Sequence, residues 1–107
     1  MDSNYGEKQY IARRIKWEQA ILVNICDEEL IGTTITGDNV DVHISKDYFG
    51  GQKVSELEAL DLVKTSSIIN LAGSRIVSKV VGAKLATAQA VKQVGDVSFL
   101  MIYKFSR

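Results

Sequence analysis

Two residues of this 107-residue chain have the types that nucleophilic catalysis uses: its one cysteine, Cys26, and its one histidine, His43. A thiolate activated by an imidazole base can attack an electrophilic carbon. Acidic neighbours raise the pKa of a thiol, however, and residues 27–29 (Asp-Glu-Glu) follow Cys26 directly. Cys26 also ends an apolar segment, which is typical of a buried cysteine. We therefore expect no catalytic residue and lean away from an enzyme, with Cys26 and His43 as the open enzymatic alternative.

Metal and cofactor sites are not indicated. One histidine and one cysteine cannot form a His/Cys metal cluster within one chain. The acidic run 27–29 lacks the spacing of a calcium loop, and helix capping is the simpler explanation. Neither of the common glycine-rich phosphate-binding motifs occurs. We expect no metal and no cofactor.

Positive charge is concentrated in the second half of the chain. The net charge is zero, but residues 1–63 hold twelve acidic and six basic residues, whereas residues 64–107 hold one acidic and seven basic. Such asymmetry indicates a charged partner, unless the two halves neutralise each other. Arg75 and Lys79 would share one face of a helix, beside serines that suit phosphate oxygens. The candidate nucleic-acid-binding residues are Arg75, Lys79, Lys84, Lys92 and Lys104.

Aromatic residues accompany glycines and basic residues at two places. The segment 48–51 (Tyr-Phe-Gly-Gly) combines a stacking surface with a backbone that a ligand can approach closely. The last strand places aromatic residues on both sides of Lys104, a pattern of sheets that bind single-stranded RNA. For 48–51 the alternative is a tight loop held by a buried ring. The candidate ligand-binding or structural residues are Tyr48, Gly50, Gly51, Asn70 and Gly73.

Hydrophobic periodicity predicts the elements that position these residues. Strands are expected at 9–14, 20–26, 33–36, 40–45, 91–94 and 97–105, with Asp27 capping a short helical turn between the second and third. A capping box at Ser55 begins a helix over about 55–65. A second helix is expected over about 67–81, with Gly73 in its middle and Gly82 after its end. Hairpins on either side of two consecutive helices indicate an α+β fold with a mostly antiparallel sheet.

Residues 1–8 are expected to form a flexible polar tail, and residues 9–107 a single domain. No segment reaches the ~18 apolar residues of a membrane span. The first eight residues contain no apolar signal region, and a lone cysteine fits a reducing compartment. We therefore expect a cytoplasmic protein without a membrane partner.

Four segments carry a family resemblance: 26–32 (CDEELIG), 48–51 (YFGG), 55–60 (SELEAL) and 69–77 (INLAGSRIV). In this order and spacing the chain resembles the archaeal domain-of-unknown-function family number 424, over about residues 9–103. The resemblance implies no assigned activity, and the family's archaeal distribution suggests a role around translation or RNA. It draws attention to Asn70, Gly73 and Arg75 in the pattern Asn-Leu-x-Gly-x-Arg. Family members often carry a histidine after the last hairpin glycine, and this chain has none at 96–99.

These observations predict a non-enzymatic binding module that contacts RNA or an RNA–protein assembly, with phosphate contacts from the basic residues of the second half. One alternative is a protein–protein adapter that uses the acidic first half or a strand edge. The other is a small enzyme built on Cys26 and His43.

Overall fold

The computed structural model describes residues 9–104 of the chain. The strands of its central sheet are β1 (Tyr10–Trp17), β2 (Ala20–Asp27), β5 (Gln52–Val54), β6 (Ile68–Ala72), β7 (Lys92–Val94) and β8 (Val97–Tyr103). The other elements are strands β3 (Thr34–Thr36) and β4 (Asp41–His43), helices α1 (Lys46–Phe49), α2 (Glu56–Thr65) and α3 (Ser74–Gly82), and 3-10 turns at Glu28–Leu30 and Ala88–Ala90. The predicted tail 1–8 and the end of the predicted last strand, Phe105, lie outside the described residues.

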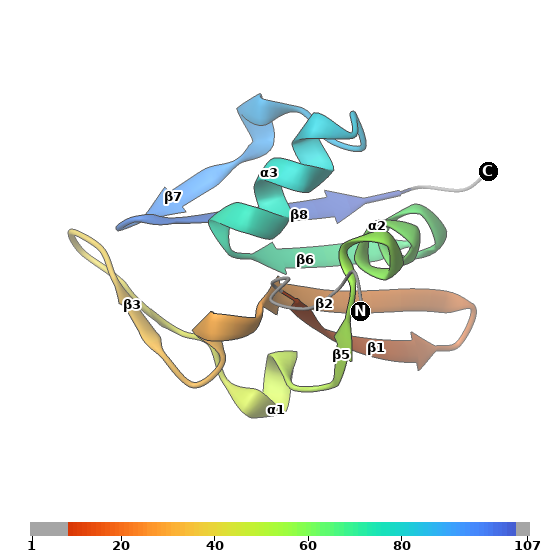
Figure 1. Ribbon diagram of the computed structural model, residues 1–107, viewed down its shortest axis with the longest axis horizontal. Helices are drawn as coiled ribbons and strands as arrows, with labels where there is room; N and C mark the ends of the chain where they lie inside the picture. Colours follow the sequence, from red (N-terminus) through yellow and green to blue (C-terminus); the bar gives the residue numbers. More distant parts are fainter. Residues whose placement is uncertain (1–8, 105–107) are drawn as a thin grey trace, which may run out of the picture.

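The central sheet has six strands in the order β5-β1-β2-β6-β8-β7 within the described range (Figure 1). Each neighbouring pair is antiparallel except β2 and β6, which run parallel. A parallel pair needs a long crossover, and here residues 28–67, with β3, β4, α1, β5 and α2, provide it. The predicted α+β fold with a mostly antiparallel sheet is confirmed. No helix within residues 9–104 has the length and apolar character that crossing a membrane requires.

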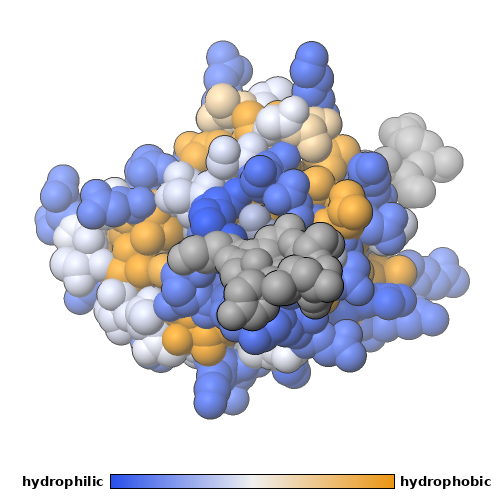
Figure 2. Space-filling view, viewed as in Figure 1, coloured by the Kyte–Doolittle hydropathy of each residue, from blue (hydrophilic) through white to orange (hydrophobic). Residues whose placement is uncertain are grey.

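One face of the sheet forms the main core with α2 and α3. Successive side chains of a strand point to opposite faces, so alternate residues of β2, β6 and β8 reach the helices. The buried strand residues on this face are Val23, Ile25, Ile69, Leu71 and Leu100. The helix residues that cover them are Ala59, Val63, Ile76, Val77 and Val80. On this side of the molecule the hydrophobic surface residues form separate patches between hydrophilic ones (Figure 2).

The opposite face is covered at one end only. There Cys26 and Ala72, at the ends of β2 and β6, pack with Ile44 and Phe49 in a second, smaller core. These two covering residues belong to the β3–β4 hairpin region and α1, which lie to one side of the central strands (Figure 1). The rest of this face has no helix over it within the described residues.

The predicted helix 67–81 is wrong over nearly its first half. Residues 68–72 form β6, and α3 begins only at Ser74. The apolar positions of this segment fit both periods, and β6 is a central strand between β2 and β8, where burial on two faces hides strand alternation. Gly73 is the N-cap of α3, not a residue of a helix interior, and its φ of 130° lies where residues with a side chain are strained.

The other predicted elements are present with small changes. The helix at 55–65 begins with the predicted capping box: Glu58 N donates to Ser55 Oγ at 3.2 Å, and Ser55 N donates to Glu58 Oε1 at 2.8 Å. β1 continues to Trp17, three residues beyond the end of the strand predicted at 9–14. Asp27 does not cap the 3-10 turn that follows it, because its side chain makes no bond there. That carboxylate is used elsewhere.

Candidate functional site

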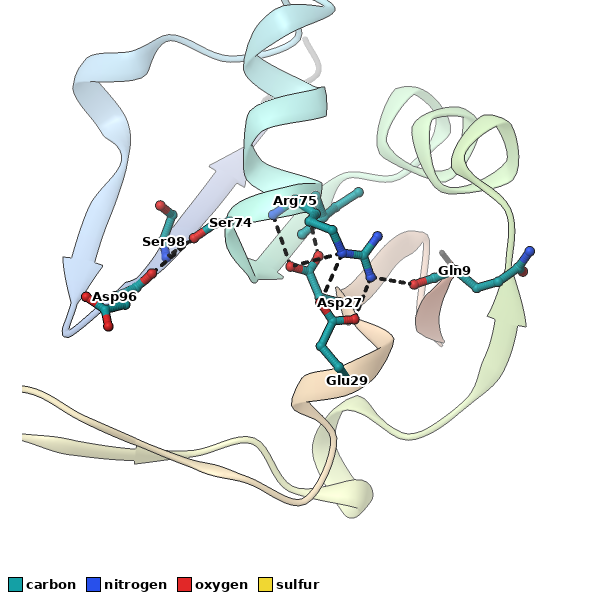
Figure 3. Close-up of polar contacts among 8 residues, drawn as sticks. Gln9, Asp27, Glu29, Ser74, Arg75, Asp96 and Ser98 are labelled. Carbon is teal, nitrogen blue, oxygen red and sulfur yellow. Dashed lines mark hydrogen bonds and ion pairs between the residues drawn. The ribbon is translucent and has the colours of Figure 1, made fainter. Parts of the chain in front are cut away.

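The carboxylate of Asp27 caps the start of α3 from a different part of the chain. Arg75 N donates to Asp27 Oδ2 at 3.0 Å, and Ile76 N donates to Asp27 Oδ1 at 2.9 Å (Figure 3). These are two of the N–H groups that a helix N-terminus leaves without partners. Burial raises the pKa of this carboxyl, and the two backbone donors act in the opposite direction. Asp27 is therefore part of the framework and is 3% exposed.

Gly73 makes this capping geometrically feasible. A Cβ atom at this position would lie 2.3 Å from the Cγ atom of Asp27, inside contact distance. The absence of a side chain lets the carboxylate reach the helix. The Asn-Leu-x-Gly-x-Arg pattern thus has a structural explanation at its glycine.

The guanidinium of Arg75 is held on three sides. Its Nε donates to Glu29 Oε2 at 3.0 Å, and its Nη2 donates to Glu29 Oε1 at 2.6 Å and to the carbonyl of Gln9 at 3.0 Å (Figure 3). It also lies over the ring of Tyr10, 4.7 Å from the centroid. The hydrogen bonds that Arg75 donates to Glu29 raise the pKa of Arg75. Arg75 therefore forms ion pairs with two residues of the acidic run 27–29.

The structure does not bring the five predicted nucleic-acid-binding residues onto one surface. Lys79, on α3, lies with its Nζ 3.5 Å from Glu56 Oε1. Lys104 donates through Nζ to the carbonyls of residues 63 and 64 at the end of α2. Lys84 is exposed after α3. Lys92 is on the opposite face of the sheet from α3, because β7 pairs it with Phe99 there.

Cys26 and His43 do not form a nucleophile–base pair. Cys26 is fully buried in the smaller core, and burial together with Asp27 and Glu29 raises the pKa of its thiol to about 12. His43 lies with its Nδ1 2.9 Å from Thr34 Oγ1. No hydrogen bond joins the two side chains within the described residues, and no cluster of three metal-binding side chains occurs there. A thiol protonated in this way is a poor nucleophile.

The Tyr-Phe-Gly-Gly segment is held against the sheet by a chain of amides. Asn70 Nδ2 donates to Asn24 Oδ1 at 2.9 Å, and Asn24 Nδ2 donates to the carbonyl of Tyr48 at 3.0 Å. Phe49 is buried, whereas Tyr48 is 53% exposed. A Cβ atom at Gly51 would lie 2.1 Å from the carbonyl oxygen of residue 12, so this glycine allows the segment to cross β1 closely.

Gly50 also has no room for a side chain, here because of the neighbouring helical turn. A Cβ atom there would lie 2.2 Å from the carbonyl oxygen of Lys46, at the end of the short helix α1. Both glycines therefore serve chain packing, as the structural interpretation of this segment expects. The exposed tyrosine ring remains available to a ligand.

The uncovered part of the second face is the open sheet face. It consists of the side chains of Arg13, Ile15, Trp17, Leu22, Ile68, Asn70, Met101 and Tyr103, with Tyr48 and Lys92 at its border. The register aligns Ile15, Leu22, Ile68 and Tyr103 in one row across four strands. Trp17, Tyr103 and Met101 are 70%, 56% and 53% exposed. Aromatic and apolar side chains without a cover are typical of interaction surfaces.

A hollow of about 390 Å³ lies in this face. Its walls include Tyr48, Asn70, Phe99 and Met101, with Lys92 at its side. The hollow is mostly apolar, but it contains one cationic and one amide group that can orient a ligand. Of the residues that the sequence analysis singled out, Tyr48, Asn70, Lys92 and His43 meet here. Sequence reasoning missed Trp17 and Met101, although the alternation of Ile15 and Trp17 with basic residues is a strand signal that extends β1 to the turn.

Comparison with protein families shows which family the sequence matches. The model described as "Protein of unknown function (DUF424)" matches residues 16–105. No curated protein matches the sequence.

Comparison with solved structures finds the crystal structure of an uncharacterized conserved protein from Methanopyrus kandleri. The TM-score is 0.77 at 21% sequence identity, and the similarity covers 92% of this chain and 94% of the other. At this identity the match shows a shared fold.

Proposed function

From the premise that the chain belongs to the DUF424 family of proteins of unknown function, we propose that it is a non-enzymatic binding module whose open sheet face contacts single-stranded RNA, alone or in an RNA–protein assembly. A role around translation and a cytoplasmic location are parts of the same proposal. The observation that carries it is the set of exposed aromatic rings, Trp17, Tyr48 and Tyr103, on or beside one uncovered sheet face.

Base stacking is the interaction this face suits best. Unpaired bases stack on aromatic rings, and each stack contributes about 1–3 kcal/mol with little dependence on sequence. A sheet supports such rings rigidly, since Trp17 pairs with Ala20 of β2 and Tyr103 pairs with Ile68 of β6. The aliphatic side chains between the rings give the bases an apolar floor.

Polar groups at the border supply contacts for the rest of a nucleotide. Arg13 and Lys92 are exposed cations on this face, and phosphate contacts of this kind supply most of the affinity of non-specific binding. Arg13 is anchored by one hydrogen bond from Nη1 to the carbonyl of Gly50, at 3.3 Å, which leaves its other donors for phosphate. Asn70 donates to Asn24 and lies in the lining of the hollow, where its side chain can hydrogen-bond to a base.

Fluorescence anisotropy with a labelled oligouridylate tests this proposal. We expect binding at low salt that weakens steeply as salt rises, because counterions are released. Tyr103→Ala should weaken binding about 5- to 100-fold, the equivalent of one lost stack. Leu57→Ala is the matched control, because Leu57 is 80% exposed on α2, across the sheet from the open face.

Two results would overturn the proposal. One is the absence of binding at low salt. The other is equal affinity of Tyr103→Ala and the parent protein, which would place any RNA contact on another surface. Purification from native cells with and without nuclease adds a further check: a partner recovered equally well after nuclease treatment indicates a protein adapter instead.

A further inference from the structure

The outer edge of β1 is only partly covered by β5. The pairing between them extends from Tyr10 to Ala12, and β1 continues for five residues beyond it. Within residues 9–104 no strand lies beside that continuation. An unpaired strand edge carries free backbone N–H and C=O groups, and another strand can form hydrogen bonds with them.

The backbone groups that face outward there can be assigned. Glu28 N donates to the carbonyl of Gln9, so residue 9 bonds toward β2, and the odd-numbered residues that follow it in β1 do the same. In an antiparallel ladder, alternate residues bond to opposite neighbours. Arg14 and Lys16 therefore direct both N–H and C=O away from β2, at the spacing of one strand ladder.

The side chains at this edge are basic. Arg13, Arg14 and Lys16 are exposed, and none of them has an ion-pair partner within the described part of the chain. A hollow of about 560 Å³ lies beside them, with Val54 and Leu62 in its lining. The edge thus combines open ladder positions, positive charge and an apolar recess.

We propose that this edge binds an extended acidic peptide segment by strand addition, with the peptide as the next strand beyond β1 in line with β5. Each outward residue presents a donor and an acceptor, and a peptide backbone pairs with both, whereas a phosphate backbone pairs with the donor alone. Acidic side chains of the peptide lie beside Arg14 and Lys16, and its alternate, apolar side chains lie on the opposite face of the sheet, beside Ile15. Arg14 and Lys16 belong to this site alone, whereas Arg13 and Ile15 also belong to the open sheet face proposed to contact RNA.

The basic charge of this edge argues against a dimer in which the β1 edges of two copies of the chain pair with each other. If the same edge of a second copy were the added strand, three basic residues of each chain would face three of the other, and like charges opposite each other destabilise a strand pair. The remaining alternative is that the charges only guard the edge against aggregation. In that case an acidic peptide does not bind.

The test uses the full chain, labelled with ¹⁵N, and a synthetic peptide of alternating Glu and Val, about six residues long as in an ordinary strand. We expect saturable binding at physiological salt and new protection of the Arg14 and Lys16 amides against hydrogen exchange. The amides of residues 13 and 15 already bond to β2 and should change little. The double variant R14E/K16E should bind this peptide about tenfold more weakly and should bind the corresponding Lys-Val peptide instead.

The double variant K84E/K92E is the matched control. It reverses the same charge away from this edge, so peptide affinity should not change, and the Lys92 substitution should weaken RNA binding. Failure of the peptide to bind overturns the inference. Binding without protection of the two amides also overturns it, because charge attraction alone does not build a ladder. Neither outcome bears on Tyr103→Ala, so the RNA proposal stands or falls separately.

Discussion

The two faces of the central sheet are built from the same strands and have different surroundings. On β6 and β8, Leu71 and Leu100 are 2% and 3% exposed beneath α2 and α3, whereas the neighbouring Met101 is 53% exposed on the open sheet face. All three side chains are apolar, so their residue types do not distinguish the faces. What differs is the cover that helices provide, and an apolar face without cover is where a partner is expected.

The same contrast separates the charged groups. At the helix-covered face, Asp27 accepts hydrogen bonds from N–H groups of α3, and Arg75 forms ion pairs with Glu29 and Asp27. Arg13, on the open face, makes one side-chain hydrogen bond, to a backbone carbonyl. Charges in the first group hold the fold, and charges in the second are available to a ligand. Four experiments test this division.

The largest effect is expected at the helix cap. Asp27→Ala removes the acceptor of two backbone N–H groups and leaves Arg75 with one carboxylate partner fewer. Loss of one partner from a buried charged network costs about 3–5 kcal/mol. Urea unfolding measures this loss in the free energy of unfolding. Asp27→Asn keeps one acceptor oxygen and should lose less; equal stability of Asp27→Ala and the parent would show that the cap does not hold α3.

A pair of core and surface truncations compares the faces directly. Leu71→Ala opens a cavity beneath the helices, and we expect a loss of about 2–5 kcal/mol. Met101→Ala removes a side chain of similar size from the open face, and its effect should stay within about 0.5 kcal/mol. Thermal or urea unfolding of the two variants measures both values. Similar losses would mean that the open face is covered in the folded protein.

Alkaline pH should reveal the burial of Cys26. Its thiol has a pKa of about 12 in the folded state, above the ordinary value. As the pH rises, the unfolded chain loses this proton before the folded protein does. The contribution of Cys26 to the free energy of unfolding is therefore fully present below the ordinary thiol pKa and falls by about 1.4 kcal/mol per pH unit above it. Urea unfolding over this pH range should show a steeper fall in stability for the parent than for Cys26→Ala, in which Tyr10, whose pKa burial also raises, still contributes. Identical slopes would place the thiol in contact with solvent.

The smallest effect on stability is expected at the most exposed aromatic residue of the open face. Trp17→Ala should change the free energy of unfolding by no more than about 0.5 kcal/mol, because Trp17 is 70% exposed. The same variant should weaken oligouridylate binding about 5- to 100-fold. Anisotropy and urea unfolding on one preparation separate the two quantities. If Trp17→Ala lost stability but kept its affinity for RNA, Trp17 would serve the packing of the fold and not the binding of a ligand.

The sequence predicted much of the architecture because most elements carry local signals. The capping box at Ser55, the glycine turns of the hairpins and the apolar run of β2 all concern neighbouring residues, and the structure contains each of them. The predicted start of α3 was wrong because the group that caps this helix, the carboxylate of Asp27, is distant in the sequence. A glycine after an apolar segment has the same sequence appearance in a helix interior and at a strand–helix junction, and only the carboxylate of Asp27 distinguishes them.

The candidate site was less accessible to sequence reasoning for a related reason. Basic residues were grouped by their position in the chain, but Lys92 and Lys79 lie on opposite sides of the sheet. Which strand face is covered depends on the path of residues 28–67, and no local pattern encodes it. Tyr48, Asn70 and Lys92 were found by residue type, and Trp17 and Met101 were missed because their importance comes from exposure.

The cap on α3 has a consequence for the order in which the chain folds. Gly73 has no side chain to begin the helix, and the carboxylate that does so is 48 residues away from the first N–H it accepts. Contacts between residues so distant in the chain form late, after the intervening loop has closed. Helix α3 thus acquires a stable first turn only when β2 and β6 have aligned side by side, so its appearance in a refolding experiment reports that the parallel pair at the centre of the sheet is in place.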